Sequence, residues 1–302
     1  MPSPPLAPSA HSHFPALAGL ALETAMRPVF LALPELSLRV ATYEGGNPMG
    51  PPLLFVHGNS LAASTFQRQW TAPELQAFRL VALNLPGHGQ SPDAPEWYSP
   101  PRLRQVLVAA IRALRCEQAL IVGHSYGGHL LLDALPELSH LRGLLTVGTP
   151  PVSTPTDLAA AFRLSETGGL FYAPSLTADQ VTALARYCLR PTSPDDEVAL
   201  LAAALGRADG RMRTALAASI AASELADEVG LVRATSVPLA FILGEKEAML
   251  APDYFASLLM PTCWGEAVQI VPRAGHLPFL ENPTAFNALL LAFAAHTSPA
   301  SH

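Results

Sequence analysis

Residues 119–128 read ALIVGHSYGG, an apolar run that ends in a serine flanked by glycines. The continuously apolar part, Ala119–Val122, is typical of a parallel strand whose two faces are both covered by helices. The glycines on either side of the serine leave room for a sharp turn, and a helix-like stretch follows. On such a turn Ser125 projects from the sheet edge, with the backbone N–H of Tyr126 beside it at the helix start. A G-x-S-x-G pattern arises by chance in roughly one chain in ten of this length, so the surrounding sequence has to decide its meaning.

Further apolar runs alternate with helix-like segments from Arg27 onward, which predicts a mostly parallel α/β sheet. In the last helical segment, one face that would pack on the sheet carries Phe286, Leu289, Leu290 and Phe293. The predicted strands are Val29–Leu33, Leu38–Tyr43, Leu53–Val56, Leu80–Leu83, Ala119–Val122, Leu144–Val147, Leu239–Leu243 and Val268–Val271.

The alternation stops between Pro151 and Ser236, where the sequence is rich in alanine and leucine and lacks strand-like runs. Helix-start signals occur there at Thr177-Ala-Asp-Gln and Ser193-Pro-Asp-Asp. We therefore predict a helical cap over residues 151–236, inserted into a core formed by residues 27–150 and 237–296. Residues 1–26 and 297–302 are predicted to be tails.

The N-terminal segment is rich in proline and has no lysine or arginine before Arg27, whereas a secretory signal begins with positive charge. We interpret it as a mobile tail, with the hypothesis that Met26 is the native start. An intact mass of the natural protein that includes residues 1–25 would reject that hypothesis. The three cysteines, Cys116, Cys188 and Cys263, are scattered, which fits reduced thiols and a cytoplasmic location.

Composition excludes several classes of partner. Half of the 302 residues are apolar and 14% are charged, so the chain can bury a sizeable core. The net charge is −6 without a basic cluster, which argues against nucleic acid. The apolar run Phe14–Leu22 is too short to span a bilayer. The H-x-H pattern, His11-Ser-His13, has no aspartate nearby, so neither a metal nor another cofactor is expected. The oligomeric state cannot be read from the sequence.

Two further segments follow predicted strands and supply polar groups. After Leu53–Val56 comes His57-Gly-Asn-Ser60, in which we assign a second oxyanion-binding N–H to Asn59 and a structural role to His57. After the last strand comes His276, next to Gly275, where a loop can hold an imidazole over the nucleophile. Among the ten histidines, His276 alone combines a late position, a strand end and a flanking glycine, so it is the predicted general base.

The third predicted member is a carboxylate after the penultimate strand, because the chain order in this topology is serine, acid, histidine. That strand leads into Gly244-Glu-Lys-Glu247, and we assign the acid to Glu247. Glu245 is interpreted as a solvated neighbour and Asp253 as a first-turn acid of a following helix. The predicted reaction is acyl transfer through a covalent intermediate on Ser125.

The segment Asn84-Leu-Pro-Gly-His-Gly-Gln-Ser91 resembles the D-x-P-G-x-G-x-S turn of the α/β-hydrolase superfamily, with asparagine in place of the usual aspartate. Together with the four blocks above, in the same order, it makes the chain similar to that superfamily from Arg27 to Phe293. The resemblance implies an α/β-hydrolase fold: an eight-stranded, mostly parallel sheet with helices on both faces and an inserted helical cap.

A narrower resemblance is to the serine-type N-acyl-homoserine lactone lactonases, the quorum-quenching hydrolases of bacteria. It rests on His57–Ser60, Gly148–Val152, Ala208–Arg211 and the Glu247 acid. It implies a Ser–His–Glu triad that opens the lactone ring without metal. Leu184 falls near the place of the tyrosine that contacts the lactone in this family, and Tyr187 is a turn away.

The apolar cap suits a small substrate with an apolar tail, an ester or a lactone. Candidate substrate-binding residues are Phe171, Tyr172, Leu184, Tyr187 and Met212, with Leu170 and Leu201 as further possible lining. Packing of the cap onto the core is the alternative for each of them. Two other functions stay open: a carboxylesterase with no lactone preference, and a ligand-binding receptor with vestigial turnover. Cofactor-free perhydrolases share the triad as well. Dehalogenases and epoxide hydrolases of this fold use an aspartate at the turn, which Ser125 argues against.

Overall fold

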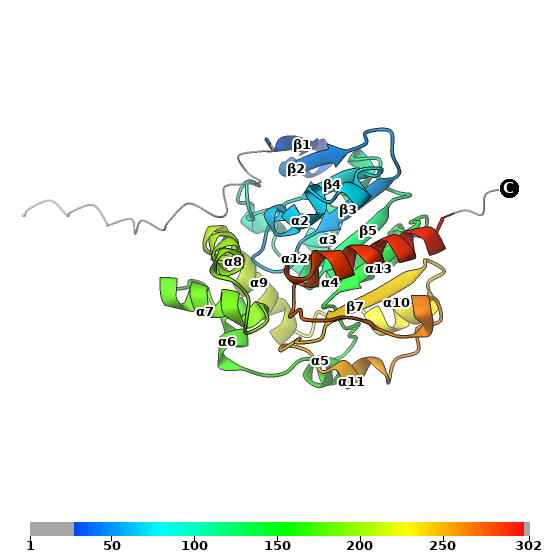
Figure 1. The fold of residues 1–302 in the computed structure, drawn as a ribbon. Coiled ribbons are helices and arrows are strands. Elements are labelled where there is room, and N and C mark those ends of the chain that lie inside the picture. The colour runs from blue at the N-terminus through cyan, green and yellow to red at the C-terminus, as the bar shows by residue number, and fades with distance from the viewer. Residues whose placement is uncertain (1–26, 299–302) are drawn as a thin grey trace, which may run out of the picture.

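The computed structural model describes residues 27–298 of the chain. An eight-stranded sheet forms its centre, in the order β1-β2-β4-β3-β5-β6-β7-β8 (Figure 1). Strand β2 is antiparallel to both of its neighbours, and the pairings from β4 to β8 are parallel. The predicted tail over residues 1–26, and residues 299–302 of the other predicted tail, lie outside the described residues. The strands are β1 (Val29–Leu33), β2 (Leu38–Gly46), β3 (Pro52–Val56), β4 (Arg79–Leu83), β5 (Leu120–His124), β6 (Gly143–Val147), β7 (Leu239–Gly244) and β8 (Gln269–Val271).

All eight predicted strands are confirmed, with differences at their ends. Strand β5 continues through Gly123 to His124, because its pairing with β6 extends until His124 lies opposite Val147. Strand β2 continues to Gly46 because it pairs with β4 along that length. Strands β5 and β6 are buried at every residue, as the continuously apolar run Ala119–Val122 predicts for β5.

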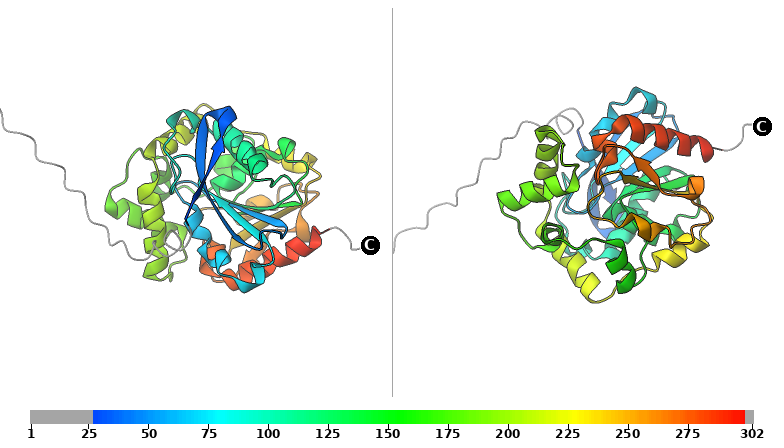
Figure 2. Two further views of the ribbon diagram at one scale, coloured as in Figure 1. Left: turned by 90° about the horizontal axis from the view of Figure 1, so that it is seen from above. Right: turned by 60° about the horizontal axis from the view of Figure 1, so that its bottom comes forward.

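Helices cover both faces of the sheet, as the α/β-hydrolase fold requires (Figure 2). One group is α3 (Pro100–Ala113), α4 (Tyr126–Asp133) and α10 (Glu228–Ala234), in which α4 packs against both α3 and α10. The other is α2 (Gln67–Trp70), α12 (Pro278–Glu281) and α13 (Pro283–His296), and α13 crosses in front of the sheet in Figure 1. The predicted apolar face of α13 buries Phe286, Leu290 and Phe293 completely, whereas Leu289 is only partly buried against the core. No helix within residues 27–298 is long and apolar enough to cross a bilayer.

Within the predicted cap, α6 to α9 lie together at one side of the sheet (Figure 1). The helices between β6 and α10 are α5 (Pro155–Ala161), α6 (Glu166–Gly169), α7 (Ala178–Cys188), α8 (Asp195–Arg207) and α9 (Gly210–Ala221). Thr177 caps α7 as its sequence predicts, with Gln180 completing the capping box. Ser193 does not cap α8, because the helix begins at Asp195 and Pro194 holds the N-cap position; the Ser193 hydroxyl donates to Glu281 at 3.3 Å. The boundaries of the cap at residues 151 and 236 stay a prediction.

Polar contacts fasten the start of α9 to the core. The N–H of Asp209 donates to the carbonyl of Gly87 at 2.9 Å. The Tyr98 hydroxyl donates to the Asp209 carboxylate at 2.7 Å, and Arg211 pairs with the same carboxylate at 2.7 Å. The N-terminus of α9 is therefore held in place over the loop that follows β4.

Candidate active site

Ser125 occupies the turn between β5 and α4 in a strained backbone conformation, with φ 49° and ψ −120°. This conformation persists because the neighbouring elements are packed too closely to allow another path. A Cβ at Gly123 would lie 2.8 Å from the Cα of Gly128, and a Cβ at Gly127 would lie 2.4 Å from the carbonyl oxygen of His57. The glycines of the motif are therefore required by close approach, and they leave Ser125 partly exposed at the end of the strand.

The loop that follows β3 lies directly against Ser125. A Cβ at Gly58 would be 3.0 Å from the Cβ of Ser125. The backbone N–H groups of Asn59 and Tyr126 donate no hydrogen bond to other residues in the range 27–298. Two free donors beside a serine hydroxyl can accept the negative charge that develops on a carbonyl oxygen during attack.

His276 and Glu247, the predicted base and acid, are bonded to each other. The distance from His276 Nδ1 to Glu247 Oε2 is 2.6 Å, and both residues are buried. The other carboxylate oxygen of Glu247 accepts the N–H of Met249 at 2.8 Å. Burial acts to raise the pKa of Glu247, but the imidazole of His276 and the hydrogen bonds from His276, Met249 and Ala248 outweigh it, so the pKa is lowered. Glu247 is therefore a carboxylate that holds a proton on His276 Nδ1.

With its Nδ1 protonated, neutral His276 keeps a lone pair on Nε2, which is the arrangement a general base needs. Residue His124, which precedes Ser125, links the two loops: its Nε2–H donates to the carbonyl of His276 at 3.1 Å, and the ring centroids are 4.7 Å apart. Ser125 Oγ and His276 Nε2 make no hydrogen bonds within residues 27–298. In enzymes without substrate such bonds are often long and tighten only in the complex.

The other two acids near this strand end face elsewhere. Glu245 is exposed and accepts the N–H of Arg273 at 2.9 Å and the ammonium of Lys246 at 3.2 Å. The bond from Arg273 is the main reason why the pKa of Glu245 is lowered. Asp253 lies in the first turn of α11 (Pro252–Phe255), as the sequence predicts. Glu247 is thus the carboxylate of the three that contacts His276.

His57 and His88 hold the oxyanion-side loop as neutral rings. His57 Nε2 accepts the N–H of Leu85 at 3.0 Å, which leaves the Nδ1–H to donate to the carbonyl of Gly58 at 2.9 Å. His88 Nε2 accepts the N–H of Ser60 at 3.2 Å. Burial lowers the pKa of His57 to about 3 and that of His88 to about 4. Both rings are therefore uncharged at neutral pH, in line with the structural role inferred for His57.

A hydrogen-bonded chain joins the same loop to the cap, and the sequence analysis did not anticipate it. Asn59 Nδ2 donates to the carbonyl of Phe171 at 3.1 Å, and the Ser60 hydroxyl donates to Asn59 Oδ1 at 2.9 Å. Arg213, which is buried, donates to the Ser60 hydroxyl at 3.2 Å and to the carbonyl of Ala173 at 2.7 Å. The alanine-rich helix α9 carries two arginines, Arg211 and Arg213, and the sequence does not show which of them reaches the core. The Arg213 side chain and the backbone carbonyl of Phe171 thus fix the loop that carries the Asn59 N–H.

The five predicted substrate-binding side chains occupy different environments. Leu184 and Met212 are fully buried among apolar side chains. Phe171 is partly buried against the core, while Tyr172 is 40% exposed. Tyr187 lines a cavity of about 460 Å³ between α6, α7 and the segment around Glu247. Contact with substrate stays a prediction for all five. Within the described residues, histidine, cysteine, aspartate and glutamate side chains form no group of three that could hold a metal ion.

Sheet order, turn geometry and the His–Glu pair together define an α/β hydrolase. The chain belongs to the alpha/beta hydrolase family, whose model matches residues 53–289. It is 27% identical over 223 residues to the pimeloyl-[acyl-carrier protein] methyl ester esterase of Yersinia pseudotuberculosis, covering 72% of this chain and 83% of that relative. The match to an epoxide hydrolase of Caballeronia sordidicola, 29% identical over 141 residues, covers 46% of this chain and only 41% of that protein.

Among solved structures, the chain is similar to the N-acyl homoserine lactonase AidH. A mutant of AidH complexed with N-hexanoyl homoserine superposes with a TM-score of 0.83 at 25% identity, covering 92% of this chain and 99% of that one. The predicted fold class and the predicted resemblance to this group of lactonases are confirmed.

Proposed function

We propose that the protein is a metal-independent serine hydrolase that cleaves a carboxylic ester or lactone. In this proposal Ser125 is the nucleophile, His276 the general base and Glu247 the acid that orients it. The observation that carries the proposal is the buried 2.6 Å bond between His276 and Glu247, beside a serine with a strained backbone at a strand end. The N–H groups of Asn59 and Tyr126 would bind the oxyanion.

In the first half of the reaction, the Ser125 hydroxyl proton moves to His276 Nε2 as Ser125 Oγ bonds to the substrate carbonyl carbon. The carbonyl electron pair moves onto oxygen, where the two N–H donors stabilise it; losing one such donor typically costs on the order of 3 kcal/mol. Glu247 stabilises the imidazolium that forms. His276 then gives its proton to the leaving alkoxide as the carbon–oxygen bond breaks.

In the second half, a water molecule attacks the acyl-enzyme and His276 takes its proton. Collapse of the second tetrahedral intermediate returns the Ser125 hydroxyl and releases the acid. When the substrate is a lactone, the leaving alcohol stays attached to the acyl group, so the product is a single ring-opened hydroxy acid.

The substrate we propose is an N-acyl-homoserine lactone, which would make the protein a quorum-quenching enzyme. The support is the similarity to AidH, including a mutant complexed with N-hexanoyl homoserine lactone, with a TM-score of 0.79 at 27% identity. A carboxylesterase without lactone preference is the second candidate, supported by the methyl ester esterase relative. We also propose a cytoplasmic location, since the three cysteines are free and buried.

A comparison of kcat/KM for acyl-homoserine lactones of several chain lengths with kcat/KM for p-nitrophenyl esters tests these alternatives. We expect both substrate types to be turned over, the lactones more efficiently, and Ser125→Ala to turn over neither while staying folded. Retained turnover in Ser125→Ala would overturn the nucleophile assignment. Equal or higher efficiency on the esters would favour the second candidate.

A further inference from the structure

One buried carboxylate, that of Glu281, binds the backbone of the His276 loop on both sides of the histidine. Glu281 Oε1 accepts the N–H of Gly275 at 2.9 Å and the N–H of Leu277 at 3.2 Å. The side chain of Glu281 is completely buried. One oxygen atom therefore binds both backbone groups that flank His276, and it fixes the direction in which the imidazole leaves the chain.

The cap also binds the His276 loop directly. The N–H of His276 donates to the carbonyl of Cys188, at the end of α7, at 2.9 Å. A Cβ at Gly275 would lie 2.7 Å from the backbone nitrogen of Arg190, so the cap backbone is pressed against the loop. The backbone N–H groups of residues 275 to 277 are thus all bound, two by Glu281 and one by the cap.

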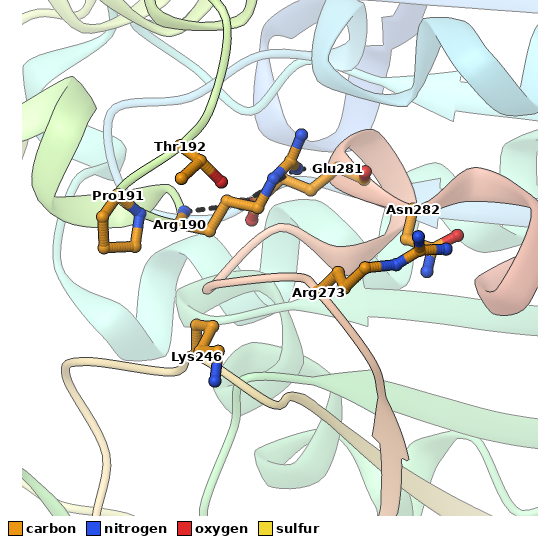
Figure 3. A pocket seen from close by; sticks show the side chains of 7 residues that line it. All are labelled: Arg190, Pro191, Thr192, Lys246, Arg273, Glu281 and Asn282. Atoms are coloured by element: carbon orange, nitrogen blue, oxygen red, sulfur yellow. Dashed lines mark hydrogen bonds and ion pairs between the residues drawn. The ribbon is translucent and has the colours of Figure 1, made fainter.

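Glu281 also joins the His276 loop to the cap. Its second oxygen, Oε2, accepts the N–H of Arg190 at 2.6 Å and the hydroxyl of Ser193 at 3.3 Å. The guanidinium of Arg190 lies 3.5 Å from the same oxygen and donates to the Glu281 carbonyl at 3.0 Å. Figure 3 shows Arg190 and Glu281 in the wall of a cavity of about 420 Å³. The side chain of Lys246, which also lines this cavity, points away from those two residues. A buried carboxylate needs such compensation, and here the cap supplies it.

We infer that Glu281 is a positioning residue for His276. In this inference the cap, docked through Arg190, covers the substrate and also fixes the position of the general base. This inference rests on the proposed function, because it concerns the base of the same reaction. It implies that the cap acts on kcat and not only on substrate choice. Glu281 itself does not contact the reacting atoms.

Glu281→Gln tests the inference. An amide can accept the two loop N–H groups or accept from Arg190, but not both, because its NH₂ group then faces a donor. We expect kcat on a p-nitrophenyl ester to fall about 10- to 100-fold with KM changed less than about threefold, since a misplaced base slows chemistry without altering binding. The rate at which a fluorophosphonate labels Ser125 should fall by a similar factor. Arg190→Gln keeps the carboxylate and should show the same pattern, including when Glu281→Gln fails to fold.

Glu228→Gln is the matched control, because Glu228 is also buried, pairs with His129 at 2.9 Å, and contacts neither Arg190 nor the His276 loop. Its kcat should stay within about twofold of wild type. Wild-type kcat and labelling rate in folded Glu281→Gln and in Arg190→Gln, with Ser125→Ala inactive, would overturn the inference and leave the proposed function standing. An equal loss in Glu228→Gln would also overturn it, by showing a general loss of structure. Turnover in Ser125→Ala would instead remove the proposed function.

Discussion

Gly148→Ala should displace the imidazole of His276 while leaving all three residues of the proposed triad unsubstituted. Gly148 follows β6, and its N–H donates to the carbonyl of Ile242 at 3.0 Å. A Cβ built on it would lie 2.5 Å from His276 Cε1 and 2.7 Å from His276 Nδ1. Nδ1 of the same ring is bonded to Glu247 at 2.6 Å, so the ring cannot move far and keep that bond.

The size of the effect follows from these distances. Ordinary contacts of a Cβ begin at 3.4 Å, so the ring or the backbone has to move by about 0.9 Å. A displacement of that order in a catalytic group costs roughly 100-fold in rate. The φ of Gly148 is also +62°, which an alanine adopts only at a cost of about 1–2 kcal/mol. We therefore expect kcat to fall on the order of 100-fold, together with a modest drop in Tm.

Steady-state kinetics on a p-nitrophenyl ester and a thermal melt measure the two effects separately. Gly206→Ala is the matched control: no atom lies within 4 Å of the new methyl group, and the site is in helix α8. Alanine favours a helix over glycine by about 1 kcal/mol, so the control should keep its kcat and its stability. A folded Gly148→Ala enzyme with wild-type kcat would show that His276 does not act from the position seen in the structure.

Two further predictions concern charge. Glu247→Gln should lower kcat on the order of 10⁴-fold, because it removes the carboxylate that holds the proton on Nδ1, whereas Glu245→Gln should leave it unchanged; the opposite result would move the acid by two residues. Burial holds the pKa of His57, His88 and His124 below the ordinary 6.5, so the unfolded chain binds protons that the folded chain refuses. Their contribution to stability is thus present above pH 6.5 and is lost as the pH falls, by about 2 kcal/mol each for His57 and His88 at pH 5. Urea unfolding at pH 8 and pH 5 measures this loss, and an unfolding free energy independent of pH would contradict the assignment.

Much of the fold was predictable because the strands are continuous apolar runs between glycine and proline turns. Their ends were less predictable, since the extension of β5 to His124 depends on pairing with β6 rather than on its own residues. The turn at Ser125 was predictable from its glycines, which exist because other atoms leave no room for a side chain there. The bond between His276 and Glu247 agrees with the order of the predicted blocks along the chain.

The contacts that hold the site were not predictable, because they join residues far apart in the chain. Glu281 follows His276 by five residues in the chain, yet only the fold shows it binding the N–H groups on both sides of that histidine. Arg213 reaches Ser60 across the boundary between cap and core. Which cap side chains point inward depends on how each segment packs on its neighbours, so Leu184 is buried whereas Tyr172 is 40% exposed, although both were predicted to bind substrate.

The proposed mechanism requires that Ser125 Oγ takes the acyl group from the substrate. Treatment with a fluorophosphonate, followed by intact-mass measurement and peptide mapping, tests that claim directly. The mechanism predicts one adduct per chain, located on Ser125, and no adduct in Ser125→Ala. Ester hydrolysis should be lost in proportion to the fraction of protein that is labelled. An adduct on another residue that tracks the loss of activity, or undiminished hydrolysis by fully labelled protein, would contradict it.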